Sequence, residues 1–404
     1  MTWYIAIPVT FYLIFRSLWM RYVCIKDFLG SQNEVLLELF APRDIEKSPK
    51  IMERFFDSIA ATDAGVNMIN KYCHCAQNPF FSLEIVGTEG VAHFYIRTPG
   101  IFRSLVESSL YAQYPGLEIM EVEDYVYKIP RVIPNKEWTL KGFDLKLLKA
   151  DAYPIKTYKY FEEDVTGKMI DPLASILESI SVLGPGQHIW LQYIIQTDRP
   201  DWFDSWGKDT VQEFLGKKAK PKSIFDRVFH DIKDVFGNLF TGLFQPPEFT
   251  PFGEQKKEEG PLEFRLTPGE KQTLKSLEEN IAKAMFQVNM RLVVVGKKDF
   301  FTATMLSGAM SSIKQFSDNH TNQFVPVDRS KVYADYVFTE SRSAYRMRKI
   351  LERYRDRDDT GYQFHLSTEE LATVFHLPDM SVAAPGVRWT DSRRGSAPSN
   401  LPFG

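Results

Sequence analysis

The first regular pattern of apolar and polar positions runs from residue 35 to residue 125. Apolar runs and strict alternation predict strands, and apolar residues three and four positions apart predict helices. A hairpin is predicted where two alternating segments flank Gly87-Thr88-Glu89-Gly90. In order, the predicted elements are strand 35–40, helix 48–61, strands 80–86 and 91–98, helix 99–114 and strand 117–125. This β-α-β-β-α-β order is typical of the ferredoxin-like, or split βαβ, fold.

A second copy of this order is predicted between residues 138 and 327. Its elements are strand 138–149, helix 172–183, strand 188–197, helix 268–285, strand 286–295, helix 300–316 and strand 324–327. The predicted fold class is therefore α+β, with two ferredoxin-like domains, the second of them interrupted by an insertion over residues 201–266. The alternative is one α+β domain built on a larger mixed sheet.

The insertion contains an amphipathic segment over residues 223–244. Its apolar side chains recur at helical spacing and form one broad face, with charged residues opposite. Three surfaces could bury that face: the rest of its own domain, a membrane interface beside the basic stretch 216–222, or the groove of a partner protein. The apolar face is represented by Phe225, Phe229, Ile232, Phe236, Leu239 and Phe240.

The densest apolar run opens the chain. Residues 3–15 carry no charge and basic residues follow them, which predicts a membrane-anchored helix at the inner (cytoplasmic) membrane. The basic residues then place the bulk of this single-pass chain in the cytoplasm. A helix lying in the membrane interface and an ordinary buried helix are the alternatives, whereas no basic segment precedes the run as a signal peptide requires. The predicted anchor residues are Trp3, Phe11, Phe15, Arg16, Trp19 and Arg21.

Composition adds little to this picture. The formal charge of −3 over 404 residues excludes a wholly basic protein that coats nucleic acid. An odd number of cysteines, three, disfavours a disulfide framework and agrees with a reducing compartment. The segment 341–359 is a local exception, because its Lys and Arg residues outnumber its acids. We expect a solvated basic face there, with contact to nucleic acid or anionic lipid as the alternative.

No residue pattern predicts a catalytic centre. The chain has no G-x-x-x-x-G-K-[ST] phosphate loop, and Gly184-Pro185-Gly186 falls in a helix-to-strand turn, the reverse of a dinucleotide loop. Cys73-His74-Cys75 resembles half a zinc site, but no second cysteine pair exists. The spacing of His365 and His376 does not place them on one helical face. We therefore expect no catalytic, cofactor-binding or metal-binding residue and no enzymatic activity, with an enzyme of unrecognised site as the alternative.

The C-terminal residues carry a family resemblance. Residues 366–378 read LSTEELATVFHLP, and residues 398–402 read PSNLP. Both resemble the segment just ahead of the ATPase core in conjugation-type coupling ATPases, the TraG/HerA-like group of type IV secretion proteins, as found in Gram-positive and uncultured small-genome bacteria. The residues that carry the resemblance are Ser367, Glu369, Glu370, Leu371, Phe375, His376, Pro378, Asn400, Leu401 and Pro402.

The resemblance implies a role in DNA translocation without catalysis. In that family the segment leads into the strand that carries the phosphate loop, and this chain ends where we expect the ATPase to begin. The implied function is a membrane-anchored module of a type IV secretion- or conjugation-like apparatus that assembles or recruits the cognate ATPase. Such a module is expected to be a homo-oligomer and to meet nucleic acid only indirectly.

The alternative function is a soluble nucleic-acid-binding α+β module. Phe81, Phe94 and Tyr95 would then supply aromatic rings on an open sheet face. The predicted organisation comprises a membrane anchor over 1–30, α+β domains over 31–130 and 131–335, and C-terminal helices with a linker over 336–404.

Overall fold

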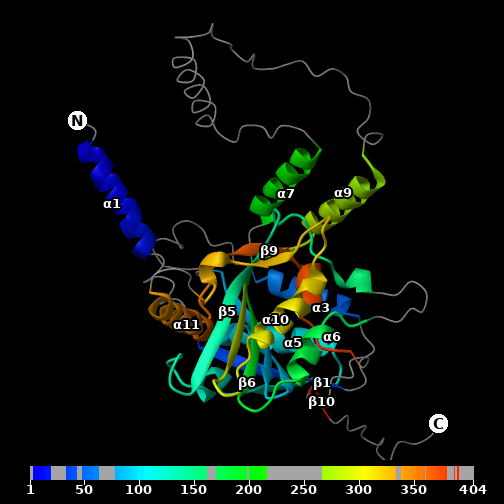
Figure 1. Cartoon of the computed structure of the whole chain (residues 1–404). Helices are drawn as coiled ribbons and strands as arrows, with labels where there is room; N and C mark the ends of the chain where they lie inside the picture. The colour runs from blue at the N-terminus through cyan, green and yellow to red at the C-terminus, as the bar shows by residue number, and fades with distance from the viewer. Residues whose placement is uncertain are drawn as a thin grey trace, which may run out of the picture.

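A sheet of ten strands crosses the centre of the molecule in the computed structural model (Figure 1). The structure describes residues 3–19, 33–42, 48–62, 78–161, 170–197, 200–215, 266–333, 338–359, 361–379, 386 and 389–390. The strands are β1 (Glu34–Pro42), β2 (Phe80–Thr88), β3 (Val91–Pro99), β4 (Glu118–Glu121), β5 (Trp138–Leu147), β6 (Gln187–Thr197), β7 (Met285–Lys297), β8 (Phe324–Pro326), β9 (Phe364–Ser367) and β10 (Trp389–Thr390).

The strands follow the order β10-β1-β3-β2-β6-β7-β5-β8, while β4 pairs with β1 and β9 pairs with β7. Every pair is antiparallel except β1 with the short β10. On either side of the β2–β6 contact the order is the same when read outward, β2-β3-β1-β4 in one half and β6-β7-β5-β8 in the other. The sheet is therefore assembled from two halves that meet at β2 and β6.

The contact between β2 and β6 overturns the predicted fold class. Their register is continuous from Phe80 opposite Gln196 to Thr88 opposite His188, so the two halves form one large antiparallel sheet. The prediction of two ferredoxin-like domains behind a membrane helix is therefore wrong. The physical reason is burial: both strands are buried along nearly their whole length, and neither could form the exposed edge of a separate domain.

Helices cover both faces of the sheet (Figure 1). The five-helix face carries α3 (Lys50–Ala60), α5 (Arg103–Gln113), α6 (Ala174–Ser181), α10 (Ala303–Ile313) and α12 (Thr368–Val374). The opposite face, here called the α11 face, carries α11 (Thr339–Arg355) and the 3-10 helix η3 (Tyr125–Lys128). Other helices in the described part of the chain are α7 (Pro200–Phe214) and α9 (Pro268–Ile281), with short 3-10 helices at Gly100–Phe102, Tyr158–Phe161, Lys314–Phe316 and Asp328–Ser330.

Helix α1 (Trp3–Trp19) holds the predicted anchor residues other than Arg21, which lies outside the described residues. Its 17 residues correspond to about 26 Å of helix, less than the ~30 Å hydrocarbon core of a bilayer. Among the helices that the structure describes, none combines the length and the apolar character needed to cross a membrane. The predicted transmembrane helix and single-pass inner-membrane location are therefore wrong.

Within α1 the apolar side chains are uncovered. Phe11, Phe15 and Trp19 are each about half exposed or more, and the rings of Phe15 and Trp19 lie 6.0 Å apart. Trp3 belongs to the same helix, and Arg16 introduces a charge within its last turn. That charge interrupts the apolar run, which is why the run is too short for the predicted span.

Candidate binding site

A row of polar side chains crosses the α11 face from β2 to β5. The strand register places Glu84 beside Gln192, Gln192 beside Arg291, and Arg291 beside Asp144. All four side chains are buried, and Arg291 Nε donates a hydrogen bond of 2.9 Å to Asp144 Oδ1. Alternate residues of a strand share a face. Phe80, Gln196 and Gln287, each four positions from Glu84, Gln192 or Arg291 on the same strand, therefore also belong to the α11 face.

The end of α11 and the residues after it cover this row. Arg357 Nε donates to Glu84 Oε1 over 2.9 Å, and the same guanidinium binds Asp124. Arg353 Nη1 donates to Asp144 Oδ2 over 2.8 Å. Burial alone would raise the pKa of Glu84, but the charge and hydrogen bonds of Arg357 lower it to about 2. The Arg291–Asp144 pair on β7 and β5 belongs to the same network. Three carboxylates thus face three guanidinium groups, and this network fixes the end of α11 to the sheet.

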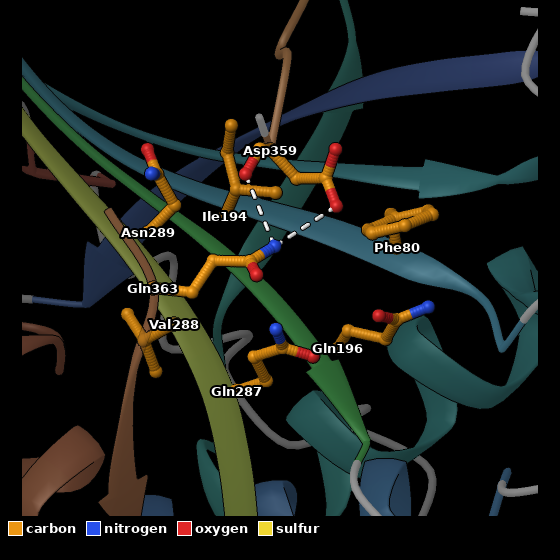
Figure 2. A pocket seen from close by; sticks show the side chains of 8 residues that line it. All are labelled: Phe80, Ile194, Gln196, Gln287, Val288, Asn289, Asp359 and Gln363. Carbon is orange, nitrogen blue, oxygen red and sulfur yellow. Dashed lines mark hydrogen bonds between the residues drawn. The ribbon is translucent and has the colours of Figure 1, made fainter. Parts of the chain in front are cut away.

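Beyond the end of α11 the described helices leave part of the same sheet face uncovered. Phe80, Gln196 and Gln287 lie side by side on β2, β6 and β7, and each is only partly buried. Together with residues that follow α11 they line a small pocket with a cavity volume of ≈ 10 Å³, about one water, here called the amide pocket (Figure 2). Its lining residues are Phe80, Ile194, Gln196, Gln287, Val288, Asn289, Asp359 and Gln363.

Hydrogen bonds fix the orientation of two amides in this pocket. Gln363 Nε2 donates to the carbonyl oxygen and to Oδ2 of Asp359, both over 3.1 Å. Gln196 Nε2 donates to the carbonyl oxygen of Asn78 over 2.9 Å. The oxygens of Gln196 and Gln363 and the second N–H of the Gln196 amide are left for other partners, and the Gln287 amide lies beside them (Figure 2).

The polar groups that line the amide pocket are neutral amides and one carboxylate, with the ring of Phe80 at one side. No lining residue is a histidine, cysteine, serine or lysine, so the pocket has no nucleophile paired with a base. In the part of the chain that the structure describes, no group of three or more His, Cys, Asp or Glu residues could hold a metal ion.

A second hollow of ≈ 540 Å³ lies between the end of α7 and the start of α9. Tyr153 and Phe214 supply its rings, which meet edge to face at 6.4 Å. The ammonium group of Lys149 donates to the carbonyl oxygens of Asn319 and His320 over 3.0 and 2.8 Å. The Lys149 ammonium group in this hollow is thus engaged in holding the loop of Asn319 and His320.

Residues 32–390 match the family model described as a domain of unknown function (DUF8128). The chain belongs to the DUF8128 family. No curated protein matches the chain. Because the family description carries no function, the resemblance to coupling ATPases, the recruitment of such an ATPase and the homo-oligomer stay predictions.

In this DUF8128 chain the residues that carry the resemblance build the core. Ser367 Oγ accepts a hydrogen bond from the Glu370 amide and Glu370 Oε2 accepts one from the Ser367 amide, which confirms the capping box expected there. The seven described members are all buried, namely Ser367, Glu369, Glu370, Leu371, Phe375, His376 and Pro378. Asn400, Leu401 and Pro402 lie outside the described residues. The motif therefore contributes packing and helix capping within this domain.

The two histidines of this region lie apart. His376 Nε2 is 3.0 Å from Asp171 Oδ1, and its Nδ1 donates to the carbonyl oxygen of Ala372. His365 contacts Asp151 instead, through a 3.0 Å approach of Nδ1 to Oδ2. Each histidine has its own carboxylate partner, and the structure does not bring the two together.

The basic helix of the DUF8128 domain is only partly solvated. Arg346 donates to the carbonyl oxygens of Lys331 and Tyr333, and Arg355 donates to those of residues 126, 129, 130 and 131. Arg353 and Arg357 belong to the buried network. Exposed positions on α11 include Arg342, Arg348 and Lys349, with Tyr345 63% exposed between them. About half of the basic side chains thus attach the helix to the body.

The aromatic residues expected on an open sheet face are buried. Phe81 and Phe94 pack on the five-helix face, and Tyr95 stacks on Tyr125 beneath α11. Phe80, which the sequence pattern did not indicate, takes the partly buried position at this face. Alternation along β2 indicates that Phe80 and Phe81 point to opposite faces, but not which face a helix covers. Outside the described residues lie Cys73, His74, Cys75 and the amphipathic set Phe225, Phe229, Ile232, Phe236, Leu239 and Phe240.

Proposed function

We propose that this DUF8128 domain binds single-stranded nucleic acid through the amide pocket. The observation that carries the proposal is the register of Phe80, Gln196 and Gln287, which aligns one ring and two amides on a part of the sheet face that the described helices leave uncovered. Single-stranded bases are recognised by stacking on aromatic rings and by hydrogen bonds to their edges. The three side chains supply both kinds of contact.

The pocket is too small to enclose a base. Its volume of ≈ 10 Å³ holds about one water, so we expect a base to stack on the ring of Phe80 at the mouth of the pocket. The carboxylate of Asp359 at the rim repels a phosphate group, so the uncharged base is the part of a nucleotide that the pocket favours.

A phosphate contact is available beside the pocket. Tyr362, whose carbonyl oxygen accepts a hydrogen bond from Asn289 Nδ2, is 44% exposed. The ammonium group of Lys146 lies 5.7 Å from the centre of the Tyr362 ring. A strand with one base stacked on Phe80 at the mouth of the amide pocket can therefore stack a second base on Tyr362 and place a phosphate at Lys146.

The test is a fluorescence-anisotropy titration of labelled single-stranded oligonucleotides with the whole chain. We expect Phe80→Ala to weaken binding by about 5- to 150-fold, which corresponds to the ~1–3 kcal/mol of one stacked base. We expect Lys146→Ala to reduce the slope of log affinity against log salt by about 0.7, because one phosphate contact is lost.

Tyr111→Ala is the matched control, since Tyr111 is 46% exposed on α5, on the other face of the sheet. It should bind like the unaltered protein. The proposal is wrong if no oligonucleotide binds at low salt, or if Phe80→Ala, folded by circular dichroism, binds as tightly as Tyr111→Ala.

A further inference from the structure

We infer that the nucleic-acid strand bound at the mouth of the amide pocket continues along a row of basic side chains on α11. The inference rests on the proposed function and adds the path and the length of the bound strand. It follows from the spacing of the bases on α11, from the contacts on that side of the helix and from the exposed tyrosines beside it.

Four bases of α11 share one side of the helix. The helix carries six basic and two acidic residues, and positions 342, 346, 349 and 353 follow one another at the three- or four-residue spacing that aligns side chains along a helix. The two acids, Glu340 and Glu352, lie at other angles around the axis. The aligned bases, here called the basic row, are Arg342, Arg346, Lys349 and Arg353.

The basic row begins beside the strand that carries Lys146. Helix α11 lies next to β5 (Figure 1), and Arg353 Nη1 donates to Asp144 Oδ2 over 2.8 Å. Lys146 is two residues from Asp144 on β5 and therefore shares its face. Further along the row, Arg346 Nη1 donates to the carbonyl oxygen of Tyr333 over 2.7 Å. The row thus leads from the β5 residues near the amide pocket to the segment that follows β8.

Exposed tyrosines accompany the bases along this path. Tyr362 is 44% exposed near the pocket, and the Lys146 ammonium group lies 5.7 Å from the centre of its ring. At the other end, Tyr333 is 58% exposed beside Arg346, and Tyr345, the residue before Arg346, is 63% exposed. Aromatic rings for stacking, combined with bases that track the backbone, are typical of sites for single-stranded nucleic acid.

Two members of the basic row are placed to contact phosphate. Arg346 and Arg353 are partly buried and attach the helix to the body, whereas Arg342 and Lys349 are exposed. These two residues are seven positions apart, which corresponds to about 10 Å along the helix. A strand that passes from Tyr362 along the row can therefore place successive phosphates near both.

The experiment measures, by fluorescence anisotropy at several salt concentrations, the binding of labelled oligothymidines of about 4 and about 12 nucleotides to the whole chain. For the longer strand we expect a slope of log affinity against log salt that is steeper by about 0.7 for each additional phosphate contact. Combining Arg342→Ala with Lys349→Ala should reduce that slope by about 1.4 and leave the shorter strand unaffected. Tyr333→Ala should weaken binding of the longer strand alone, by about 5- to 150-fold.

Arg348→Ala is the matched control, because Arg348 is an exposed base of the same helix that lies off the basic row. It should bind both strands like the unaltered protein, as should Lys349→Arg, which keeps the charge. Tyr127→Ala is the control for Tyr333→Ala, since Tyr127 is 79% exposed on η3, away from the row.

The outcomes separate the inference from the proposed function. Equal salt slopes for the two lengths, or a double variant that binds the longer strand like Arg348→Ala, would overturn the path along α11, while the shorter strand and Phe80→Ala still test the pocket. If the double variant loses binding of the longer strand but Phe80→Ala does not, the basic row stands and the amide pocket is wrong. Absence of binding of either strand at low salt would overturn both.

Discussion

Glu84 occupies the middle of β2, where its carboxylate is completely buried among hydrogen-bond donors. Ser82 Oγ and the phenol of Tyr125 donate to it over 2.7 Å each, and Gln192 Nε2 donates over 3.0 Å. Arg357 adds a positive charge at 2.9 Å. Removing one partner of a buried pair generally leaves the other charge uncompensated. Protonation of Glu84 at low pH is therefore expected to weaken the attachment of α11 to the sheet.

The pH dependence of this carboxylate has a definite sign. Its pKa is about 2 in the folded chain against an ordinary value of 4.5, so between these pH values the unfolded chain binds a proton and the folded chain does not. The stabilisation is present in full above pH 4.5 and is lost as the pH falls through about 2. The shift corresponds to a contribution of this carboxylate to the free energy of unfolding on the order of 3 kcal/mol.

We expect Glu84→Gln to lower the free energy of unfolding at neutral pH by about 3–5 kcal/mol, as for a broken buried ion pair. The deficit should shrink between pH 4.5 and pH 2, because only the unaltered protein loses an ionised carboxylate there. Urea denaturation over that pH range measures both effects. Glu118→Gln, at an exposed position of β4, is the control and should be nearly neutral. Parallel acid curves for Glu84→Gln and the unaltered protein would contradict the assignment.

At the scale of an element, helix α12 contains a carboxylate, Glu370, whose pKa is shifted in the direction opposite to that of Glu84. All seven of its residues are buried, and its first turn depends on the capping box formed by Ser367 and Glu370. Glu370 Oε1 also accepts from the Ile155 amide over 2.9 Å, which ties the helix to another segment of the chain. Burial nevertheless dominates and raises the pKa of Glu370 to about 7. The folded chain thus keeps a proton that the unfolded chain releases near pH 4.5.

The contribution of Glu370 to stability is therefore present below pH 4.5 and is lost as the pH rises through about 7. Gln also serves in a capping box and does not titrate. We expect Glu370→Gln to gain stability relative to the unaltered protein, by on the order of 3 kcal/mol, as the pH rises from 4.5 to above 7. Guanidinium denaturation at the two ends of this range measures the difference, with the exposed Glu278→Gln of α9 as control. A difference that does not change with pH would refute this reading of α12.

Local elements could be predicted because their signals are local. The period of Ile51, Phe55 and Ile59 predicts a helix, and α3 covers these residues. The Ser367–Glu370 spacing predicts a capped helix, and α12 begins there. The amide pocket could not be predicted, because Gln196 and Gln287 come from strands far apart in sequence whose register depends on the assembled sheet. Nor does any local pattern indicate that α11 covers one end of that face and leaves the other open.

At the scale of the whole molecule, the contact between β2 and β6 decides whether the two halves of the sheet unfold together. Both strands are buried, and the five-helix face places Leu83, Leu145 and Tyr193 from both halves in one continuous apolar cluster. Separate domains would have separate cores and would unfold independently, whereas a shared core couples the halves. We therefore expect one cooperative unit where the sequence pattern predicted two.

The substitution Leu145→Ala tests this coupling. Leu145 is fully buried on β5, and its truncation should lower the free energy of unfolding by about 2–5 kcal/mol. Hydrogen exchange followed by mass spectrometry in increasing urea reports on β1 and β3 of the other half separately from β5. If one core holds the sheet together, the unfolding midpoint of β1 and β3 falls together with that of β5. A midpoint for β1 and β3 that stays unchanged while β5 is destabilised would show that the halves unfold independently.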